Sequence, residues 1–356
     1  MSKRCASTAE PRIEEKGLVC PRNSRYLDGG LLDIVSSVAR RRLGHETRTR
    51  PDMTEPAFVA VDWGTSSFRL WLVDRAGRVL AERRSGEGML AAAKTGFPAV
   101  LQAHLAAVDA PDHLPVLVCG MAGAKTGWVE AGYVDTPARL SAVLKQAVRV
   151  PGEARDIRIL PGIAQRDAAA PDVMRAEETQ LLGALGLDAA GEALVCMPGT
   201  HSKWVRVKDG TVERFSTFMT GELFGAVSRE TILSLAIAGA DDAEDIASFK
   251  AAVKAAFDAP AFAANLLFTA RSRQLLFGGT PAAARETVSG TLIGVELAAG
   301  LSGSVLQAGV QLIAAGRLAM LYRLAFEALS VTAKPVDADE AVRRGLSMAA
   351  AAIWAK

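Results

Sequence analysis

The same three-strand unit occurs twice in this sequence, and it constrains the fold more than any other feature. Each copy consists of short apolar or alternating runs separated by turns that contain Gly and polar residues, a pattern that predicts strands joined by hairpins. The strands are expected over 57–61, 68–73 and 78–82 in the first copy and over 193–197, 203–207 and 211–215 in the second. Such a repeat predicts two sheets built on one plan.

The rest of the chain alternates helical and strand-like segments, which places it in the α/β class. Further strands are expected over 116–119, 157–160 and 310–314, and helices over 95–108, 137–148, 176–186, 221–233, 243–256, 261–271, 281–302, 316–329 and 338–355. At 356 residues the chain is about twice as long as an ordinary domain. We therefore expect two domains, over 55–190 and 191–356, with a ligand cleft between them.

Composition argues against several classes of protein. A net charge of +2 with dispersed basic residues gives no surface for tracking nucleic-acid phosphates. Cys119 and Cys196 each close an apolar run, as buried thiols do, and the four cysteines have no disulfide or metal spacing. No apolar run approaches the roughly 20 residues of a membrane span, and no signal layout is present. We expect a cytoplasmic protein without a membrane or nucleic-acid partner.

Residues 1–54 differ in character from the remainder. They mix charges of both signs with Pro and Gly, include the run Ala39–Arg42, and have one short apolar stretch, Leu31–Val38. This composition predicts a disordered extension. Because Met53 lies just before the first clear strand, an over-long start is an alternative, and a basic arm that docks a partner is another.

The two hairpin turns contain the residues best suited to bind phosphate groups. In the first, Asp62 ends a buried strand and is followed by a Gly and hydroxyl residues that could direct N–H and O–H groups at phosphate oxygens while the carboxylate binds a counter-cation. An ordinary hairpin in which the Asp caps its own turn is the alternative. The second turn, 198–202, favours the phosphate interpretation because it repeats the Gly-Thr pair. The candidate phosphate contacts are Gly64, Thr65, Ser66, Ser67, Gly199, Thr200 and His201.

Five ordered sequence blocks resemble the 2-dehydro-3-deoxygalactonokinase family. They are Asp62–Ser67, Gly120–Gly123, Met174–Gln180, Pro198–Trp204 and Met219–Leu223, and the likeness runs from about residue 57 to the C-terminus. The resemblance implies a two-domain actin-like ATPase fold, related to ribonuclease H, with the active site in the interdomain cleft. It also implies ATP and Mg²⁺ as cofactors and transfer of the γ-phosphate to the 6-hydroxyl of 2-dehydro-3-deoxygalactonate, in galactonate breakdown.

Roles in such a reaction can be assigned to acids and cations near the turns. Asp62 is the expected Mg²⁺ ligand; Glu177 and Glu178, at the start of a helix, are the candidates for the general base, and Glu178 also for the metal. Because neighbours on a helix point about 100° apart, the two should not share one role. Acids that merely complement the helix dipole are the alternative. The candidate substrate contacts are Arg69, Gly123, Lys125, Arg175 and Lys203, of which some cations are expected to be only solvated.

Two positions depart from the family pattern. Ala176 stands where a Gly is expected, and Arg317 follows Gly316 in the adenosine loop where a small polar residue is usual. A separate motif, Gly86–Ala91, matches a dinucleotide-binding pattern, but the internal Glu87 would repel a pyrophosphate.

Two other functions compete with this interpretation. Another actin-like sugar kinase would act on a neutral hexose or pentitol, and a non-catalytic member would polymerise, act as a chaperone-like ATPase or sense a sugar. The sequence leaves open the sugar-acid epimer and the oligomeric state, for which a homodimer is one interpretation.

Overall fold

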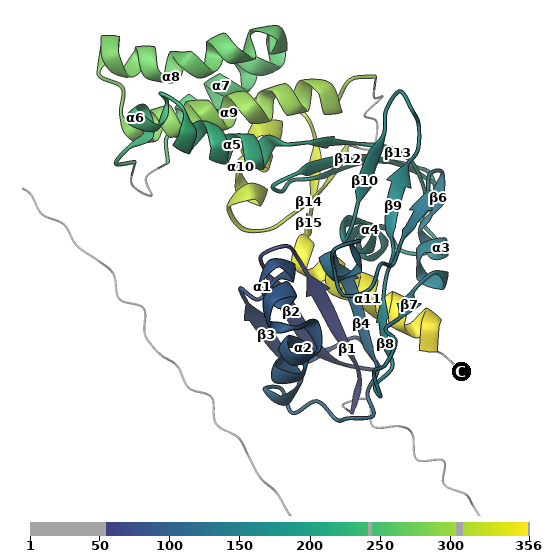
Figure 1. Ribbon diagram of the computed structural model, residues 1–356. Coiled ribbons are helices and arrows are strands. Elements are labelled where there is room, and N and C mark those ends of the chain that lie inside the picture. The colour runs from purple at the N-terminus through teal and green to yellow at the C-terminus, as the bar shows by residue number, and fades with distance from the viewer. Residues whose placement is uncertain (1–54, 241–243, 304–308, 355–356) are drawn as a thin grey trace, which may run out of the picture. The chain divides into compact units, whose positions relative to one another are not determined.

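Two six-stranded sheets with the same internal order form the framework of the protein (Figure 1). In this computed structural model the described residues are 55–240, 244–303 and 309–354. The first sheet has the order β3-β2-β1-β4-β8-β7 and the second has the order β15-β14-β11-β12-β13-β6. The strands of the first sheet are β1 (Pro56–Trp63), β2 (Phe68–Asp74), β3 (Val79–Ser85), β4 (Val116–Gly120), β7 (Val148–Arg149) and β8 (Ile157–Ile159). Those of the second are β6 (Ala138–Arg139), β11 (Glu192–Met197), β12 (Ser202–Lys208), β13 (Thr211–Phe218), β14 (Val310–Ala314) and β15 (Ala333–Asp337).

The pairing directions in the two sheets are also the same. In the first sheet β1, β2 and β3 are antiparallel, while β4 runs parallel to β1 and β8 runs parallel to β4. In the second sheet β11, β12 and β13 are antiparallel, while β14 and β15 continue in parallel on the other side of β11. This duplicated plan confirms the predicted α/β fold class and is the plan that the resemblance to an actin-like ATPase fold implies.

A small third sheet and the helices complete the fold. The third sheet contains β5 (Tyr133–Asp135), β9 (Gly162–Gln165) and β10 (Asp172–Met174). The α-helices are α1 (Met89–Thr95), α2 (Phe97–Ala106), α3 (Leu140–Lys145), α4 (Glu177–Leu185), α5 (Thr220–Glu230), α6 (Ser234–Ile237), α7 (Ile246–Asp258), α8 (Ala263–Phe277), α9 (Pro281–Gly300), α10 (Gly316–Ala328) and α11 (Ala338–Trp354), and short 3₁₀ turns lie at Met121–Gly123 and Pro260–Phe262.

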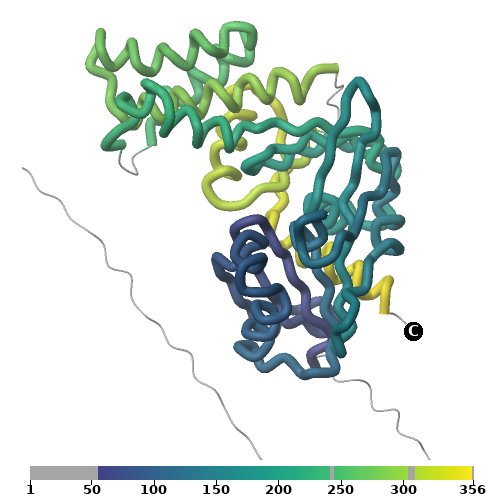
Figure 2. The backbone as a smooth tube through the Cα atoms, in the orientation of Figure 1, coloured from purple at the N-terminus to yellow at the C-terminus, as the bar shows by residue number. Residues whose placement is uncertain are grey.

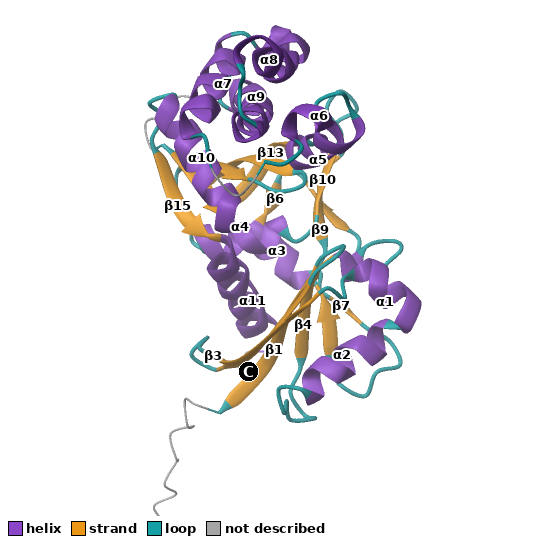
Figure 3. Cartoon of the chain, turned by 90° about the vertical axis from the view of Figure 1, so that its left-hand side faces the viewer, coloured by secondary structure: helices purple, strands orange, loops and turns teal. Residues whose placement is uncertain are grey.

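Alternation along the strands decides which helices cover each face. Val59 and Val61 of β1 point toward α1 and α2, whereas Phe58 and Ala60 point toward α4 and α11. This second core also includes Val195 from β11, so α4 and α11 are packed between the two sheets (Figure 3). The opposite face of the second sheet is covered by α7, α9 and α10.

The last helix returns to the first sheet. Figure 2 shows the chain path, on which α11 lies beside the beginning of the described chain, and α11 contacts β1, β4 and α4. Residues Arg50–Lys356 form one unit by their contacts, with β6 and α11 each reaching into the other half. The division into two domains at residue 190 therefore stays a prediction, and the proposed disordered extension 1–54 lies outside the described residues.

Among the described helices, one bent pair has the length and composition of a membrane span. No single described helix is both long and apolar enough to span a membrane; α7 together with Pro260–Phe277 satisfies the length and composition criteria, with a bend of 113°.

Candidate active site

The first phosphate turn is held in place by the start of α1. Gly64 donates its backbone N–H to Ser67 O at 2.9 Å, which closes the turn. The backbone N–H of Leu90 bonds Thr65 O at 3.1 Å. Gly88 packs so closely that a Cβ there would lie 2.5 Å from both Ser67 N and Thr65 O. The dinucleotide-like motif 86–91 therefore has a packing explanation, because its second glycine allows α1 to approach the turn.

The second turn is supported in the same way by the start of α5. The backbone N–H of Glu222 bonds Thr200 O at 3.0 Å, and a Cβ on Gly221 would lie 2.5 Å from Gly199 O. The His201 ring is paired with Glu222 at 2.6 Å, and about half of each side chain is exposed. The block 219–223, which followed from family resemblance alone, thus has a structural reason to accompany the second turn.

Asp62 lies in a network of charges at the end of β1. Its Oδ2 is 2.5 Å from Arg69 Nη2, and Arg69 also bonds Asp339 at the start of α11. Asp339 is held in addition by Arg84 at 2.8 Å. Burial raises the pKa of Asp62, although the charge of Arg69 opposes that shift. Burial would also raise the pKa of Asp339, but bonds and charge from Arg84 and Arg69 lower it. Arg69, predicted to contact substrate, is thus committed to two carboxylates.

A different carboxylate lies beneath the second turn. Glu296 of α9 is 1% exposed and accepts bonds from Trp204 Nε1 at 2.8 Å, from the Tyr322 hydroxyl at 2.6 Å and from the Thr220 hydroxyl. The Tyr322 hydroxyl also lies 3.1 Å from Ser202 Oγ, which accepts from the backbone N–H of Gly199 at 3.4 Å. Burial raises the pKa of Glu296, against the donors that stabilise its charge. Sequence reasoning missed this residue.

The two candidate base residues have unlike surroundings. Glu177 lies 3.4 Å from Lys203 Nζ, and Lys203, only 5% exposed, also bonds the backbone carbonyl of His201 in the second turn. Glu178 is 1% exposed; its Oε1 accepts from Ala176 N and the Thr179 hydroxyl, each at 3.1 Å, and its Oε2 has no partner in the described structure. Burial, followed by repulsion from Glu177, raises the pKa of Glu178 to about 8.

The Cys119 thiol connects the first turn to the start of α4. It lies 3.8 Å from Asp62 Oδ1 and is buried. Burial raises its pKa, and the charges of Asp62 and Glu178 raise it further. Asp62 therefore lies near the start of α4. The ion pair of Glu177 with Lys203 connects the start of α4 to the second turn.

The backbone at the start of α4 is strained. Ala176 has φ +93°, a value that favours glycine and that L side chains rarely adopt. This strain gives a physical reason why a glycine is expected at this position.

Among the remaining predicted substrate cations, Arg175 has unused donors. Its guanidinium stacks on the Tyr133 ring at 4.4 Å and donates to Gly132 O at 2.9 Å, but its Nε and Nη1 are buried without a partner among the described residues. A Cβ on Gly123 would lie 2.8 Å from Arg175 Nη1, so the two predicted residues are neighbours. Lys125 is exposed.

The adenosine-loop candidate Gly316 starts α10 with φ +58°. The unusual Arg317 beside it is paired with Glu286 at 2.6 Å and with Glu244 at 3.6 Å. These ion pairs explain how the loop accommodates a large cation at that position.

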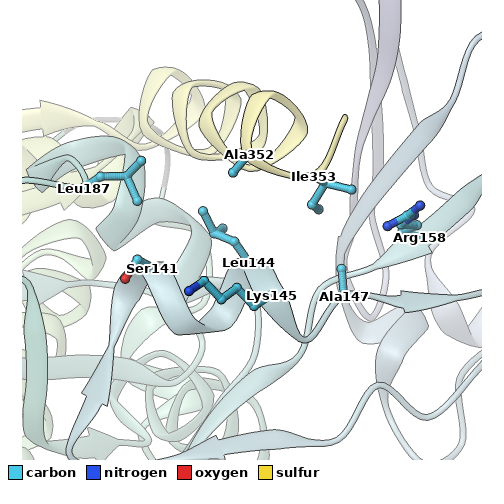
Figure 4. A pocket seen from close by; sticks show the side chains of 8 residues that line it. All are labelled: Ser141, Leu144, Lys145, Ala147, Arg158, Leu187, Ala352 and Ile353. Carbon is cyan, nitrogen blue, oxygen red and sulfur yellow. The ribbon is translucent and has the colours of Figure 1, made fainter. Parts of the chain in front are cut away.

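A surface hollow of about 390 Å³ lies elsewhere, between α3 and the C-terminal end of α11 (Figure 4). Of its two charged lining residues, Lys145 and Arg158, the latter is bound by Asp156 through two bonds of 3.1 Å. None of the predicted site residues lines it. It is lined by Ser141, Leu144, Lys145, Ala147, Arg158, Leu187, Ala352 and Ile353.

Two acids near the turns, Asp339 and Glu296, were absent from the sequence-based site. Asp339 follows β15, and an acid directly after a parallel strand beside β14 could have been noticed had that strand been expected. Glu296 lies in the apolar second half of α9, where a buried carboxylate implies a buried partner.

Comparisons with known proteins agree with the sequence blocks. The profile of the 2-keto-3-deoxy-galactonokinase family matches residues 62–349. The chain is 59% identical to a probable 2-dehydro-3-deoxygalactonokinase of Rhizobium meliloti (strain 1021), over 83% of this chain and 97% of that one. It is 31% identical to a 2-dehydro-3-deoxygalactonokinase of Escherichia coli (strain K12), over 83% and 98%. A crystal structure of a Sinorhizobium meliloti protein named for the same activity is 59% identical and superimposes with a TM-score of 0.81, covering 84% of this chain and all of that chain.

Proposed function

Because the chain belongs to the 2-keto-3-deoxy-galactonokinase family, we propose that it transfers the γ-phosphoryl group of ATP to a hydroxyl of 2-dehydro-3-deoxygalactonate. The observation that carries the proposal is the contact of Glu177 with Lys203, which joins a candidate base to the second Gly-Thr turn. Both turns expose backbone groups at the ends of paired strands, as phosphate binding requires.

A magnesium ion fits the first turn. Within the described ranges no group of three His, Cys, Asp or Glu side chains is arranged to hold a metal. Mg²⁺ in kinases is usually held by one or two carboxylates together with phosphates and water, so a smaller set suffices. Asp62, with Asp339 on the other side of Arg69, provides that set. When bound, the ion would neutralise charge on the transferring phosphates.

We assign the general base to Glu177 in preference to Glu178. About a quarter of the Glu177 side chain is exposed, so a hydroxyl can reach it, whereas Glu178 is sealed and its raised pKa keeps it protonated near neutral pH. The Lys203 ammonium, 3.4 Å from the Glu177 carboxylate, holds that side chain beside the second turn, where a base would have to lie. Glu178 then has a structural role, holding the strained backbone at Ala176.

The substrate carboxylate is best matched by Arg175. Buried guanidinium N–H groups without acceptors are costly, at about 1 to 3 kcal/mol each, and an anion would remove that cost. Arg69 and Lys203 already neutralise acids, which makes them less suitable. Arg175 therefore supplies the specificity for a sugar acid over a neutral sugar.

The transfer step forms one bond to phosphorus and breaks another. The substrate hydroxyl oxygen attacks the γ-phosphorus, the bond between that phosphorus and the β–γ bridging oxygen breaks, and the hydroxyl proton passes to Glu177. ADP leaves with the electron pair of the broken bond. The turns at 64–67 and 199–201 orient the phosphates, which is the largest contribution a protein makes to this reaction. Gly316 lies at the loop assigned to the adenosine.

The cellular setting follows from this function. We place the enzyme in the cytoplasm, with ATP and the sugar acid as its partners and without a nucleic-acid or membrane partner. Exposed apolar side chains at the end of α8, Leu275, Leu276 and Phe277, form the surface on which a homodimer would be sought by sedimentation velocity.

The direct test is ADP release by the purified protein with Mg²⁺ and each of three acceptors: 2-dehydro-3-deoxygalactonate, its gluconate epimer and a neutral hexose. We expect turnover on the galactonate compound and a loss of about 10² to 10⁴ in kcat for Glu177→Gln. The matched control is the exposed Glu192→Gln, which should keep wild-type activity. Turnover on the hexose alone would contradict the sugar-acid assignment, and nucleotide-dependent polymers without turnover would contradict catalysis.

A further inference from the structure

A cavity of about 430 Å³ lies over the face of the second sheet that α9 covers. Trp204 and Arg206 of β12 line it together with Arg214, Ser216 and Phe218 of β13 and the end of α9 at Ala299–Gly303. No residue of either phosphate turn lines this cavity. Arg206 lies near the far end of β12 from the second turn, so the cavity is distinct from the proposed active site.

Two arginines face each other in this cavity. Arg206 and Arg214 are directly opposite in the antiparallel pair of β12 and β13, and like charges in that arrangement destabilise a sheet. Burial lowers the pKa of Arg206, and the charge of Arg214 lowers it further. Arg206 donates to Ser302 O at 2.9 Å, whereas Arg214 forms no ion pair with any residue in the described part of the chain.

The chemistry of the lining selects a class of ligand. Two guanidinium groups from directly opposite strand positions line one cavity, and together they favour a group with more than one negative charge. Trp204 and Phe218 add an apolar wall, and Ser216 adds a hydroxyl. We propose that this cavity binds a phosphate group, either as free phosphate or as an organic phosphate ester, and that its occupancy alters the affinity for ATP.

A continuous set of hydrogen bonds joins the cavity to the second turn. Trp204 donates to Glu296, which accepts from Tyr322, and Tyr322 contacts Ser202 at the end of the turn. Glu296 also accepts from Thr220 at the start of α5, the helix that packs on the turn. An anion that shifts Trp204 would therefore act on the turn through Glu296. The effect on ATP rests on the proposed function, whereas binding of the anion does not.

The test is calorimetric titration of the full chain with inorganic phosphate and, separately, with glycerol 3-phosphate. A saturating non-hydrolysable ATP analogue with Mg²⁺ is present throughout, which blocks the phosphate turns. We expect one site per chain and a loss of affinity of about ten- to hundredfold in Arg214→Gln, because one charged hydrogen bond is lost. Equal affinity for both anions identifies the phosphate group as sufficient, and tighter binding of the ester assigns its organic part to the Trp204 wall.

Two further variants keep the result interpretable. Arg75→Gln, at an exposed turn of the first sheet, is the matched control and should bind like the wild type. Ser216→Asp places a negative charge in the cavity and should abolish binding without disturbing Arg214. Unchanged affinity in Arg214→Gln, or no binding of either anion, would overturn the site. In wild type, but not in Arg214→Gln, the bound anion should shift the KM for ATP by at least about twofold; binding with an unchanged KM would overturn the coupling.

Discussion

At the first phosphate turn the buried carboxylate, Asp62, is paired with the charged Arg69, whereas at the second the buried carboxylate, Glu296, is held by neutral donors. The two turns occupy equivalent places in the duplicated sheets, since Gly64 and Gly199 each follow the first strand of a sheet. In the first half Asp62 ends that strand and is paired with Arg69, while in the second half the equivalent position is the buried Met197. The carboxylate of the second half comes instead from helix α9, as Glu296.

This difference indicates a division of labour between repeats that share one backbone. At the first turn Asp62 is buried, but its partner Arg69 is partly exposed, and we propose that a metal and phosphates replace this arginine. Below the second turn the Glu296 carboxylate is buried. Its bonds to Trp204, Thr220 and Tyr322 fix the backbone that surrounds it. A buried network in which every member is satisfied makes a local structure rigid. We therefore expect the first turn to act mainly through its charge and the second through its geometry.

The largest expected effect is at Asp62. Asp62→Asn keeps the shape of the side chain but removes its charge, so kcat should fall by about 10² to 10³, the scale of losing one main electrostatic contact in a transition state. Steady-state ADP release measures it. Asp112→Asn, at a fully exposed carboxylate, is the control. If Asp62→Asn kept more than a tenth of the activity, the first turn would not act through charge.

At the second turn we expect Glu296→Ala to reduce stability by about 3 kcal/mol, because three buried donors lose their acceptor. Denaturant unfolding measures this loss. The KM for ATP should also rise, since the turn loses its support, and Glu296→Gln should recover part of both effects. The control is Asp74→Ala, which removes another buried carboxylate, one that binds the β2–β3 turn. Equal KM values for ATP in the two alanine variants would show that Glu296 acts on stability alone.

The third expected effect is a dependence of stability on pH, caused by Glu178. Its pKa is about 8 in the folded protein and 4.5 in the ordinary reference state, so the folded state favours the protonated acid. The resulting stability is full below about pH 4.5 and is lost as the pH rises through 8. Glu178→Gln should therefore be more stable than wild type by about 4 to 5 kcal/mol at pH 8.5 and by about 1 kcal/mol at pH 5. Unfolding at both pH values, with and without Mg²⁺, measures the difference.

Glu178 at the metal would give a different result. Added Mg²⁺ would then stabilise the wild type and not Glu178→Gln. The proposed structural role of the buried Glu178 would then be wrong.

The smallest effect is expected at Ala176. Ala176→Gly should stabilise the protein by about 1 kcal/mol, because glycine adopts φ +93° without strain. Thermal unfolding measures the gain. Ala184→Gly in the same helix is the matched control and should destabilise by a similar amount. A loss of stability in Ala176→Gly would mean that the Cβ contact contributes more than the strained backbone costs.

Much of the framework could be predicted from sequence because local patterns specify it. The strands of both repeated units and the helices around 177–185 and 316–328 carry strong periodicity and clear turns. β15 was missed because Ala333–Asp337 contains Pro335, which argues against a strand in general but is tolerated at a sheet edge. The expected helix over 95–108 is present as α2, which begins after Gly96 with φ +95°, whereas the preceding helix α1 was not expected.

The site, too, could be predicted from sequence only in part. Residues in contiguous blocks, such as Asp62 or Glu177, could be proposed from sequence, and the structure brings them into a chain of contacts through Cys119 and Lys203. Asp339 and Glu296 could not be proposed, since they reach the turns only through tertiary packing from distant helices. The commitment of Arg69 to Asp339 also depends on a contact 270 residues apart.

The most direct test of this division of labour is the affinity for ATP with and without Mg²⁺, measured by calorimetry for wild type, Asp62→Asn and Glu296→Gln. We expect Mg²⁺ to tighten ATP binding to the wild type, to have little effect on Asp62→Asn, and to tighten binding to Glu296→Gln by the wild-type factor although both affinities are lower. A wild-type response to Mg²⁺ in Asp62→Asn, or loss of that response in Glu296→Gln, would contradict the assignment of charge to the first turn and geometry to the second.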